Sequence, residues 1–396
     1  MKKLYKLLPL CLSVVFALAA GCSKDYSISI EREDLAAFPI GMFEDELDLF
    51  NLEQRGGMKK TEFAMRDGQF FIANGTGAKV VRYNSYGDLL FMIYNEETNP
   101  RLLNLKQKSE DADETRWAYA WDLRQPSHIA VDSQKNIFVV DKLPPERNSY
   151  NAAEKAVLDS IVLCFDNTGR FIEYLGQEGR GGTPFSRIEG IWTTVNDDIV
   201  VVCRTSRGIN AFRFDSAGNH QTTLTFQNEK LPVPSGNQGL ITSFESVAVA
   251  PDKAVIYLKM NYYREIVDPS VNTAAGVAAE SSWLWLVDMD TGEYIRGVDI
   301  PFYVPDEGEN ALYALFGAAN NEKVFLYTPV EEGFAILILQ TDGSNKQRRG
   351  VIRVNSDELQ FITFNISFDG VLSALLADDF NVRIVWWRTD RLAREM

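Results

Sequence analysis

The sequence predicts an all-β fold built from repeated short sheets, and three observations support this. Apolar and polar residues alternate at period two through most of the chain, most clearly from Pro126 to Gly179. Turns that contain glycine recur between these alternating stretches. Beyond the first 21 residues, no long stretch shows the 3.6-residue period of an amphipathic helix, so a helical fold is disfavoured.

The recurring turns divide the chain into repeats. Their glycines are Gly87, Gly169, Gly218, Gly292 and Gly343, separated by 82, 49, 74 and 51 residues. The short intervals fit one bare four-stranded unit, and the long ones contain insertions. A sixth unit starts at Gln360 and supplies three strands. We therefore expect a six-bladed β-propeller, closed by an N-terminal strand at residues 45–52 (DELDLFNL), which leaves no open sheet edge.

One repeat carries a family resemblance. Residues 126–132 (PSHIAVD), a following strand and residues 165–169 (FDNTG) resemble the NHL repeat, a propeller-blade motif. His128 stands where the motif has glycine, and residues 142–159 replace the motif's Asn-His-Arg turn. The resemblance implies the blade fold and no particular ligand.

The N-terminus has the features of an export signal. Basic Lys2, Lys3 and Lys6 precede an apolar stretch at residues 7–20 that is too short to span a bilayer comfortably. Residues 18–22 (LAAGC) resemble a bacterial lipobox, with Ala19 where leucine is usual. The resemblance implies cleavage after residue 21 and acylation of Cys22, which makes the lipid bilayer a partner. The alternative is an ordinary signal peptide with an unmodified Cys22.

These features define the expected organisation: a signal peptide at 1–21, a lipidated tether at 22–36 and the propeller at 37–396. The expected location is the cell envelope, either facing the periplasm or on the outer membrane. The overall pattern is also similar to that of uncharacterised spirochaete envelope lipoproteins, a resemblance that implies no activity.

Charge and cysteine content narrow the function further. The chain carries a net charge of −15, or −18 once three signal-peptide lysines are removed, so nucleic acid is not expected as a partner. The basic segment 346–349 (KQRR) is a local exception with the pattern of a solvated turn. Cys164 and Cys203 lie within apolar strand patterns and are expected to be small buried side chains. A disulfide between them is the alternative, for which their spacing gives no argument.

The insertions predict a binding face. They lie at residues 95–125, 142–159, 228–242, 264–281 and 301–310. Each one joins strands two and three of a blade, or one blade to the next, so all should emerge on the same face. We expect that face to bind an envelope protein through the aromatic and arginine side chains Trp117, Tyr119, Trp121, Arg147, Tyr150, Tyr262, Tyr263 and Arg264. The alternative is that these side chains only hold the long loops onto the propeller.

Catalytic patterns are scarce. The chain has two histidines, His128 and His220, and no nucleophile or phosphate-binding motif, so we expect a non-catalytic scaffold without a cofactor. One enzymatic alternative remains: Glu62, Glu189 and Glu245 fall near the starts of innermost strands and could converge at the channel mouth. Such carboxylates suit calcium, and six-bladed lactonases that resemble this architecture bind a divalent ion there. The alternative function is therefore a calcium-dependent hydrolase.

Overall fold

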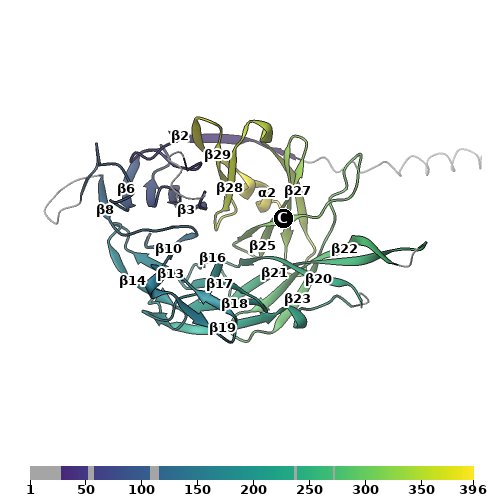
Figure 1. Cartoon of the computed structure of the whole chain (residues 1–396). Helices are drawn as coiled ribbons and strands as arrows, with labels where there is room; N and C mark the ends of the chain where they lie inside the picture. Colours follow the sequence, from purple (N-terminus) through teal and green to yellow (C-terminus); the bar gives the residue numbers. More distant parts are fainter. Residues whose placement is uncertain (1–27, 52–57, 108–115, 236–238, 271–272) are drawn as a thin grey trace, which may run out of the picture.

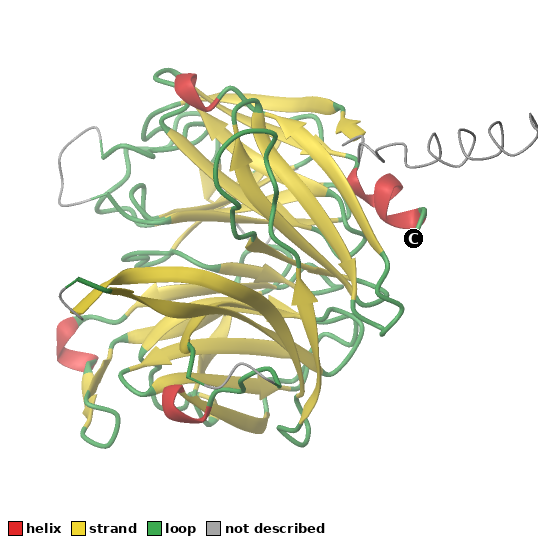
Figure 2. Cartoon of the chain, turned by 90° about the vertical axis from the view of Figure 1, so that its right-hand side faces the viewer, coloured by secondary structure: helices red, strands yellow, loops and turns green. Residues whose placement is uncertain are grey.

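The computed structural model describes residues 28–51, 58–107, 116–235, 239–270 and 273–396, and the described chain is folded almost entirely as β-strands. Figure 1 shows short sheets arranged in a ring around a central axis, and Figure 2 shows how little helix there is. The all-β propeller prediction is confirmed. Cys11 and Cys22 lie outside the described residues.

Five blades are each built from consecutive strands. Blade 1 contains β3 (Thr61–Arg66), β4 (Gln69–Asn74), β5 (Lys79–Tyr83), β6 (Leu89–Tyr94), β8 (Trp117–Ala120) and β7 (Lys106–Gln107), in that spatial order. Blade 2 contains β9 (Ile129–Val131), β10 (Ile137–Lys142), β13 (Ser160–Phe165), β14 (Phe171–Gly176) and β15 (Gly179–Arg180). Blade 3 contains β16 (Arg187–Thr193), β17 (Ile199–Thr205), β18 (Gly208–Phe214) and β19 (His220–Gln227). Blade 4 contains β20 (Ile241–Val249), β21 (Val255–Asp268), β22 (Thr273–Asp288) and β23 (Tyr294–Ile300). Blade 5 contains β24 (Ala314–Ala319), β25 (Lys323–Val330), β26 (Gly333–Gln340) and β27 (Gln347–Arg353), with β1 (Ile28–Ile30) added in parallel to its outer edge.

The remaining sheet is a composite of both ends of the chain. It joins β28 (Phe361–Ile366), β29 (Leu372–Ala377) and β30 (Asn381–Trp387) to β2 (Arg32–Pro39), which supplies the outer strand. The minor elements are η1 (Pro145–Arg147), the two-stranded sheet of β11 (Ser149–Asn151) and β12 (Ala156–Leu158), η2 (Asn228–Lys230), η3 (Ser356–Glu358) and α2 (Thr389–Arg394). The prediction of a six-bladed propeller is corrected accordingly: the structure has five blades of consecutive strands, and the composite sheet stands between blades 5 and 1.

The closing strand was predicted in the wrong place. Residues 45–50 form turns, and only an isolated bridge from Ile40 to Leu47 occurs there. Their alternation instead reflects Leu47 and Leu49, which are buried in the core between the composite sheet and blade 1. Between them, the Asp48 carboxylate accepts a hydrogen bond from the backbone N–H of Asn51 (2.8 Å) and holds the turn. Strands β1 and β2 lie partly within residues 28–36, which the sequence analysis assigned to the tether, and residues 22–27 of that tether lie outside the described chain.

The core consists of apolar clusters between neighbouring sheets. One such cluster fills each sheet-to-sheet interface, including both interfaces of the composite sheet. Cys164 and Cys203 are both free thiols buried between blades 2 and 3, and burial raises the pKa of Cys164 to about 12. Continuous packing around the ring closes the propeller without a free inner edge.

Antiparallel pairing within each sheet gives the ring two different faces. One carries the tight turns between strands one and two and between strands three and four, and is called the turn face. The other carries the connections between strands two and three and between sheets, and is called the loop face. The predicted turn glycines have positive φ, from +76° at Gly292 to +96° at Gly343, which explains why glycine recurs there.

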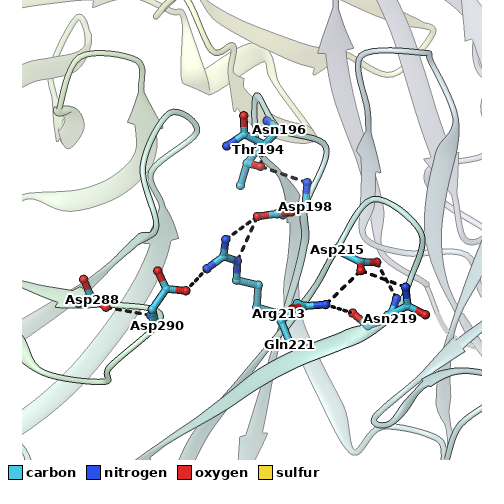
Figure 3. A network of polar contacts seen from close by, with 9 residues as sticks. All are labelled: Thr194, Asn196, Asp198, Arg213, Asp215, Asn219, Gln221, Asp288 and Asp290. Atoms are coloured by element: carbon cyan, nitrogen blue, oxygen red, sulfur yellow. Dashed lines mark hydrogen bonds and ion pairs between the residues drawn. The ribbon is translucent and has the colours of Figure 1, made fainter.

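Polar side chains fix the turn face. The Asp215 carboxylate accepts hydrogen bonds from the backbone N–H groups of Ala217 (3.0 Å) and Asn219 (2.8 Å). Beside it, Arg213 donates to Asp198 of its own blade (2.7 Å) and also pairs with Asp290 in the turn of blade 4 (Figure 3). Charge-assisted contacts of this kind tie adjacent blades together where the apolar core ends.

A buried lysine anchors the segment that follows β2. Lys79 is fully buried, and its ammonium donates to the backbone carbonyl of Phe43 (2.6 Å). Burial lowers the pKa of Lys79 to about 8, although the nearby carboxylates of Glu46 and Asp48 partly oppose this. Met42 and Asp48, which lie in this anchored segment, help to line a cavity of the loop face between blades 1 and 2.

This pKa predicts a pH dependence of stability. Because the folded-state pKa of Lys79 lies below its unfolded value of 10.5, the unfolded chain binds more protons between these values. The free energy of unfolding of the native protein should therefore rise, relative to Lys79→Met, by about 3 kcal/mol as pH increases from 8 to 10.5. Urea unfolding of both proteins at several pH values measures this. The same comparison with Lys230→Met, an exposed lysine, is the control, and parallel curves for Lys79→Met would contradict the prediction.

Candidate binding face and channel mouth

The loop face carries every long connection of the described chain. Because strands alternate in direction, the ends of β6, β10, β19, β21 and β23 all lie at this face. Some insertions are more ordered than the sequence suggested: residues 95–125 include β7 and β8, and residues 264–281 extend a β-hairpin. The connections of the opposite, turn face are all short, so the two faces differ strongly in shape.

A small flap covers part of blade 2. It consists of η1 and the two-stranded sheet of β11 and β12. Arg147 lies over the ring of Tyr174, 5.1 Å from its centroid, whereas Tyr150 is 64% exposed. On the other side, the Glu154 carboxylate accepts a hydrogen bond from Asn210 of blade 3 (2.7 Å). The flap is therefore held at both ends and presents Tyr150 to solvent.

The β21/β22 hairpin projects from blade 4, as Figure 1 shows to the right of the ring. Its base is paired on both sides, because β20 begins opposite Tyr263 and β23 ends opposite Ser282. Beyond that point the two strands pair only with each other. Arg264 forms an exposed two-point ion pair with Glu280 (3.1 and 2.8 Å), while Ile266 and Val277 are about half exposed. The projecting ribbon thus offers two unpaired edges and apolar side chains.

Three of the predicted contact residues pack against the propeller. Trp117 and Trp121 are partly buried: the Trp117 indole donates to the carbonyl of Thr168 (2.7 Å), and Trp121 stacks on Phe171 at 4.0 Å. Tyr262 is fully buried, and its hydroxyl donates to the carbonyl of Pro232 (2.6 Å). These contacts match the alternative in which aromatic side chains hold the loops onto the propeller.

The other predicted contact residues are more accessible. Tyr119 and Tyr263 are half-buried, whereas Arg147, Tyr150 and Arg264 are exposed. The structure does not bring these five into one cluster by direct contacts; they are distributed over blade 1, the flap and the hairpin. The accessible part of the predicted surface is therefore spread along the loop face.

The channel mouth is lined by ion pairs. Glu62 of β3 contacts the Lys60 ammonium (2.5 Å), and its other oxygen lies 2.9 Å from Nδ1 of His128. Burial would raise the pKa of Glu62, but the hydrogen bonds and charges of His128 and Lys60 outweigh it and lower that pKa. His128 is buried and tied to Glu62, as expected for a structural histidine, whereas His220 is exposed.

The other two predicted carboxylates have similar partners. Glu189 accepts from Arg187 (3.1 Å) and Arg204 (3.0 Å). Glu245 forms an ion pair with Lys259, whose side chain is fully buried, and accepts from Asn261 (2.8 Å). Glu189 and Glu245 each sit at a β-bulge, which turns the extra residue out of the regular pairing. A cationic partner for each carboxylate was missed by the sequence analysis.

These pairs do not make a calcium site. Among the described residues, no group of three or more His, Cys, Asp or Glu side chains could hold a metal ion. Glu62, Glu189 and Glu245 are each compensated by a cation from a neighbouring position, so their charges are already balanced. The proposed ligand set is therefore not assembled.

Calcium should accordingly leave the stability of the protein unchanged. We expect millimolar calcium to shift the melting temperature by less than about 1 °C, because the residues that the structure describes assemble no group of carboxylates for it. Differential scanning fluorimetry with and without chelator measures this, with Glu189→Gln and Glu245→Gln measured alongside. A calcium-dependent rise of several degrees that disappears in these variants would restore the hydrolase alternative.

Three neighbouring cavities lead from the loops of blades 1 and 2 toward the centre of the ring. The outer one, about 460 Å³, lies between the loops of blades 1 and 2 and includes Lys59 and Lys142. The next, about 280 Å³, shares Lys142 with it and also contains Lys60 and Arg187. The innermost, about 200 Å³, has Glu62 and Glu189 on one side and the aromatic rings of Phe316 and Phe364 on the other. The loop face therefore has both protruding and hollow parts.

Membrane-spanning helices are not found in the described part of the chain: none of its helices is long and apolar enough to cross a bilayer.

Comparison with known proteins gives similarity at the level of architecture. No family model matches the chain, and no curated protein is recognisably similar to it. The crystal structure of the polysaccharide lyase Uly1 is 11% identical and aligns over 91% of this chain and 99% of its own, with a TM-score of 0.47. The β-propeller domain of the trilobed protease from Pyrococcus furiosus, described as having an open velcro topology, is 10% identical over 82% of this chain and 81% of its own, with a TM-score of 0.36. At these identities the similarity concerns the fold alone, and the chain is a β-propeller by its own sheet arrangement.

Proposed function

We propose that this protein is a lipid-anchored lipoprotein of the cell envelope whose propeller is a non-catalytic scaffold that binds a protein partner through the loop face. The observation that carries the proposal is the presence of exposed apolar side chains on several separate insertions of that face. They are Tyr150 (64% exposed), Val157 (52%), Ile266 (48%), Val277 (55%) and Val304 (70%). Exposed apolar side chains on rigid extensions are typical of protein-binding surfaces.

Charge and rigidity support a protein partner. The net charge of −15 disfavours nucleic acid. The flap and the hairpin are held by contacts at their bases, so binding would cost little ordering entropy. The proposed location rests on the sequence: the basic and apolar N-terminal segment and the lipobox-like LAAGC ending at Cys22.

Site-specific photocrosslinking in intact cells tests the binding face. A photoreactive residue at Tyr150 or Val277 should give a discrete crosslinked product, whereas the same residue at Ser216 or Thr291 in turn-face turns should give none. Replacing residues 266–277 by Asn-Gly should weaken the crosslink at Tyr150 if the hairpin belongs to the same surface. Crosslinks that are equal on both faces would refute the proposal.

The anchor is tested separately. Mass spectrometry of the purified protein should show loss of residues 1–21 and acyl chains on Cys22, and Cys22→Ala should release the protein into the soluble fraction when membranes are washed at high salt. An unmodified Cys22 would remove the anchor from the proposal while leaving the binding face in place.

A further inference from the structure

One basic patch stands out on this acidic protein. The KQRR segment begins at Lys346 in the turn before β27, and α2 lies beside it at the end of the chain. The Lys346 ammonium donates to the carbonyl of Met396 (2.7 Å), and Arg348 donates to the carbonyl of Glu395 (2.8 Å). Arg391 and Arg394 of α2 are both exposed. We call Lys346, Arg348, Arg391 and Arg394 the basic patch; it lies on the turn face.

The patch keeps its positive charge at the surface. Segments 342–349 and 388–396 together contain six Lys or Arg and three Asp or Glu side chains, a net charge of +3 in a chain of −15. One of the three acids, Asp390, is buried and accepts from both Arg388 (2.8 Å) and Arg394 (2.8 Å). The Arg394 side chain remains 71% exposed in this pair. The exposed side chains of the patch therefore carry a net positive charge.

The described part of the chain begins beside this patch. β1 pairs in parallel with β27, and Ile28 lies opposite Gly350, two residues after Arg348. That separation is about 7 Å along a strand. Because β27 runs from the turn face toward the loop face, the N-terminal end of β1 points toward the turn face. A side chain at Gly350 would collide with Ile30 and Leu392, so glycine lets β1, β27 and α2 pack closely.

The distance from the anchor is short. Ile28 follows Cys22 by six positions, and six fully extended residues span at most about 20 Å. An acylated Cys22 would hold the bilayer surface within about 20 Å of Ile28, and therefore close to the basic patch. Cationic side chains close to a membrane are attracted to anionic headgroups, and one weak anchor is strengthened by a polybasic surface.

We propose that the basic patch docks on the anionic headgroups of the membrane that holds Cys22, so that the turn face lies on the bilayer and the loop face points away from it. The anchoring part rests on the proposed function. The remaining surface, which carries the excess negative charge, is repelled by the same headgroups, and this favours a single orientation. The loop face is thereby left open to a partner.

Vesicle binding without the anchor tests the patch directly. The protein carrying Cys22→Ser should bind vesicles of 70% phosphatidylcholine and 30% phosphatidylglycerol, and bind pure phosphatidylcholine far more weakly. Lys346→Gln, Arg348→Gln and Arg391→Gln combined should weaken binding by roughly fivefold for each cation at low salt. The matched control combines Arg101→Gln, Lys230→Gln and Arg207→Gln, which remove the same charge from the loop face. Equal binding by both triple variants, or no preference for the anionic vesicles, would overturn the proposal.

Orientation is read from the acylated protein on the same anionic vesicles. A fluorophore on Ser344→Cys, beside the patch, should be quenched by headgroup-labelled lipid, and one on Ser149→Cys in the flap should not. Equal quenching at both positions would refute the orientation. If mass spectrometry instead shows Cys22 unmodified, the anchor fails, but the vesicle experiment still decides the patch.

Discussion

Deleting residues 28–39 is expected to prevent the propeller from folding to a stable, soluble form. The deletion removes β1 and β2, which pair with β27 of blade 5 and with β30 of the composite sheet. It also removes Ile30 and Phe38 from the core, and burial of each such side chain contributes about 1.5–3 kcal/mol. Two exposed strand edges would then favour aggregation. Since a whole domain is stable by only about 5–15 kcal/mol, this loss is comparable with the total.

Soluble yield, size-exclusion chromatography and thermal unfolding measure the effect. The matched control replaces residues 266–277, which are also twelve in number, by Asn-Gly. That segment is the tip of the projecting hairpin, and none of its side chains whose burial the structure describes lies in the core, so the control should keep the native melting temperature within a few degrees. Adding a peptide of residues 28–39 to the truncated protein should restore stability. A truncated protein that is monomeric and melts like the native one would show that the composite sheet does not need its outer strand.

The closing strand illustrates why one part of the fold was predictable and another was not. Turn glycines such as Gly169 and Gly218 are visible in the sequence because the positive φ of the turn requires glycine. Strand β2 is an outer strand with a bulge at Leu35, and only Phe38 of its residues is buried. Its sequence, REDLAAFP, therefore shows almost no alternation. Residues 45–52 alternate more clearly, but that pattern comes from two leucines on either side of a turn.

The candidate site was predictable to a similar extent. The face of the ring could be predicted because strand order alone decides where each insertion emerges. The burial of Trp117 and Tyr262 could not, because each depends on a carbonyl group in a distant part of the chain, at Thr168 and Pro232. The cations beside the glutamates did leave a signal: Arg204 and Lys259 lie on the strand after each glutamate, 15 and 14 positions later. Cross-strand pairing within each hairpin would have placed these cations opposite the glutamates.

Replacing Glu245 is expected to cause the largest loss of stability among single substitutions at the channel. Its partner Lys259 lies on β21 with a fully buried side chain, within reach of Glu245 and of the Asn261 oxygen (3.0 Å). Burial lowers the pKa of Lys259, and the charge of Glu245 opposes that change. Glu245→Gln leaves the buried ammonium without a counter-charge, which typically costs about 3–5 kcal/mol. Lys259→Met should cost less, since Glu245 is partly exposed and keeps its hydrogen bond from Asn261.

A double-mutant cycle separates the pair from its surroundings. Lys259→Met combined with Glu245→Gln should cost less than the sum of the two single changes, because neither charge is then left alone. The free energy of unfolding of Glu245→Gln should also rise with pH up to the unfolded lysine value, since the unfolded chain binds more protons there. The control is Glu280→Gln, which breaks the exposed pair with Arg264 in the same blade and should leave the stability almost unchanged, because solvent screens that pair. Urea unfolding followed by tryptophan fluorescence gives all four values, and an additive cycle would mean that Lys259 and Glu245 stabilise the channel independently of each other.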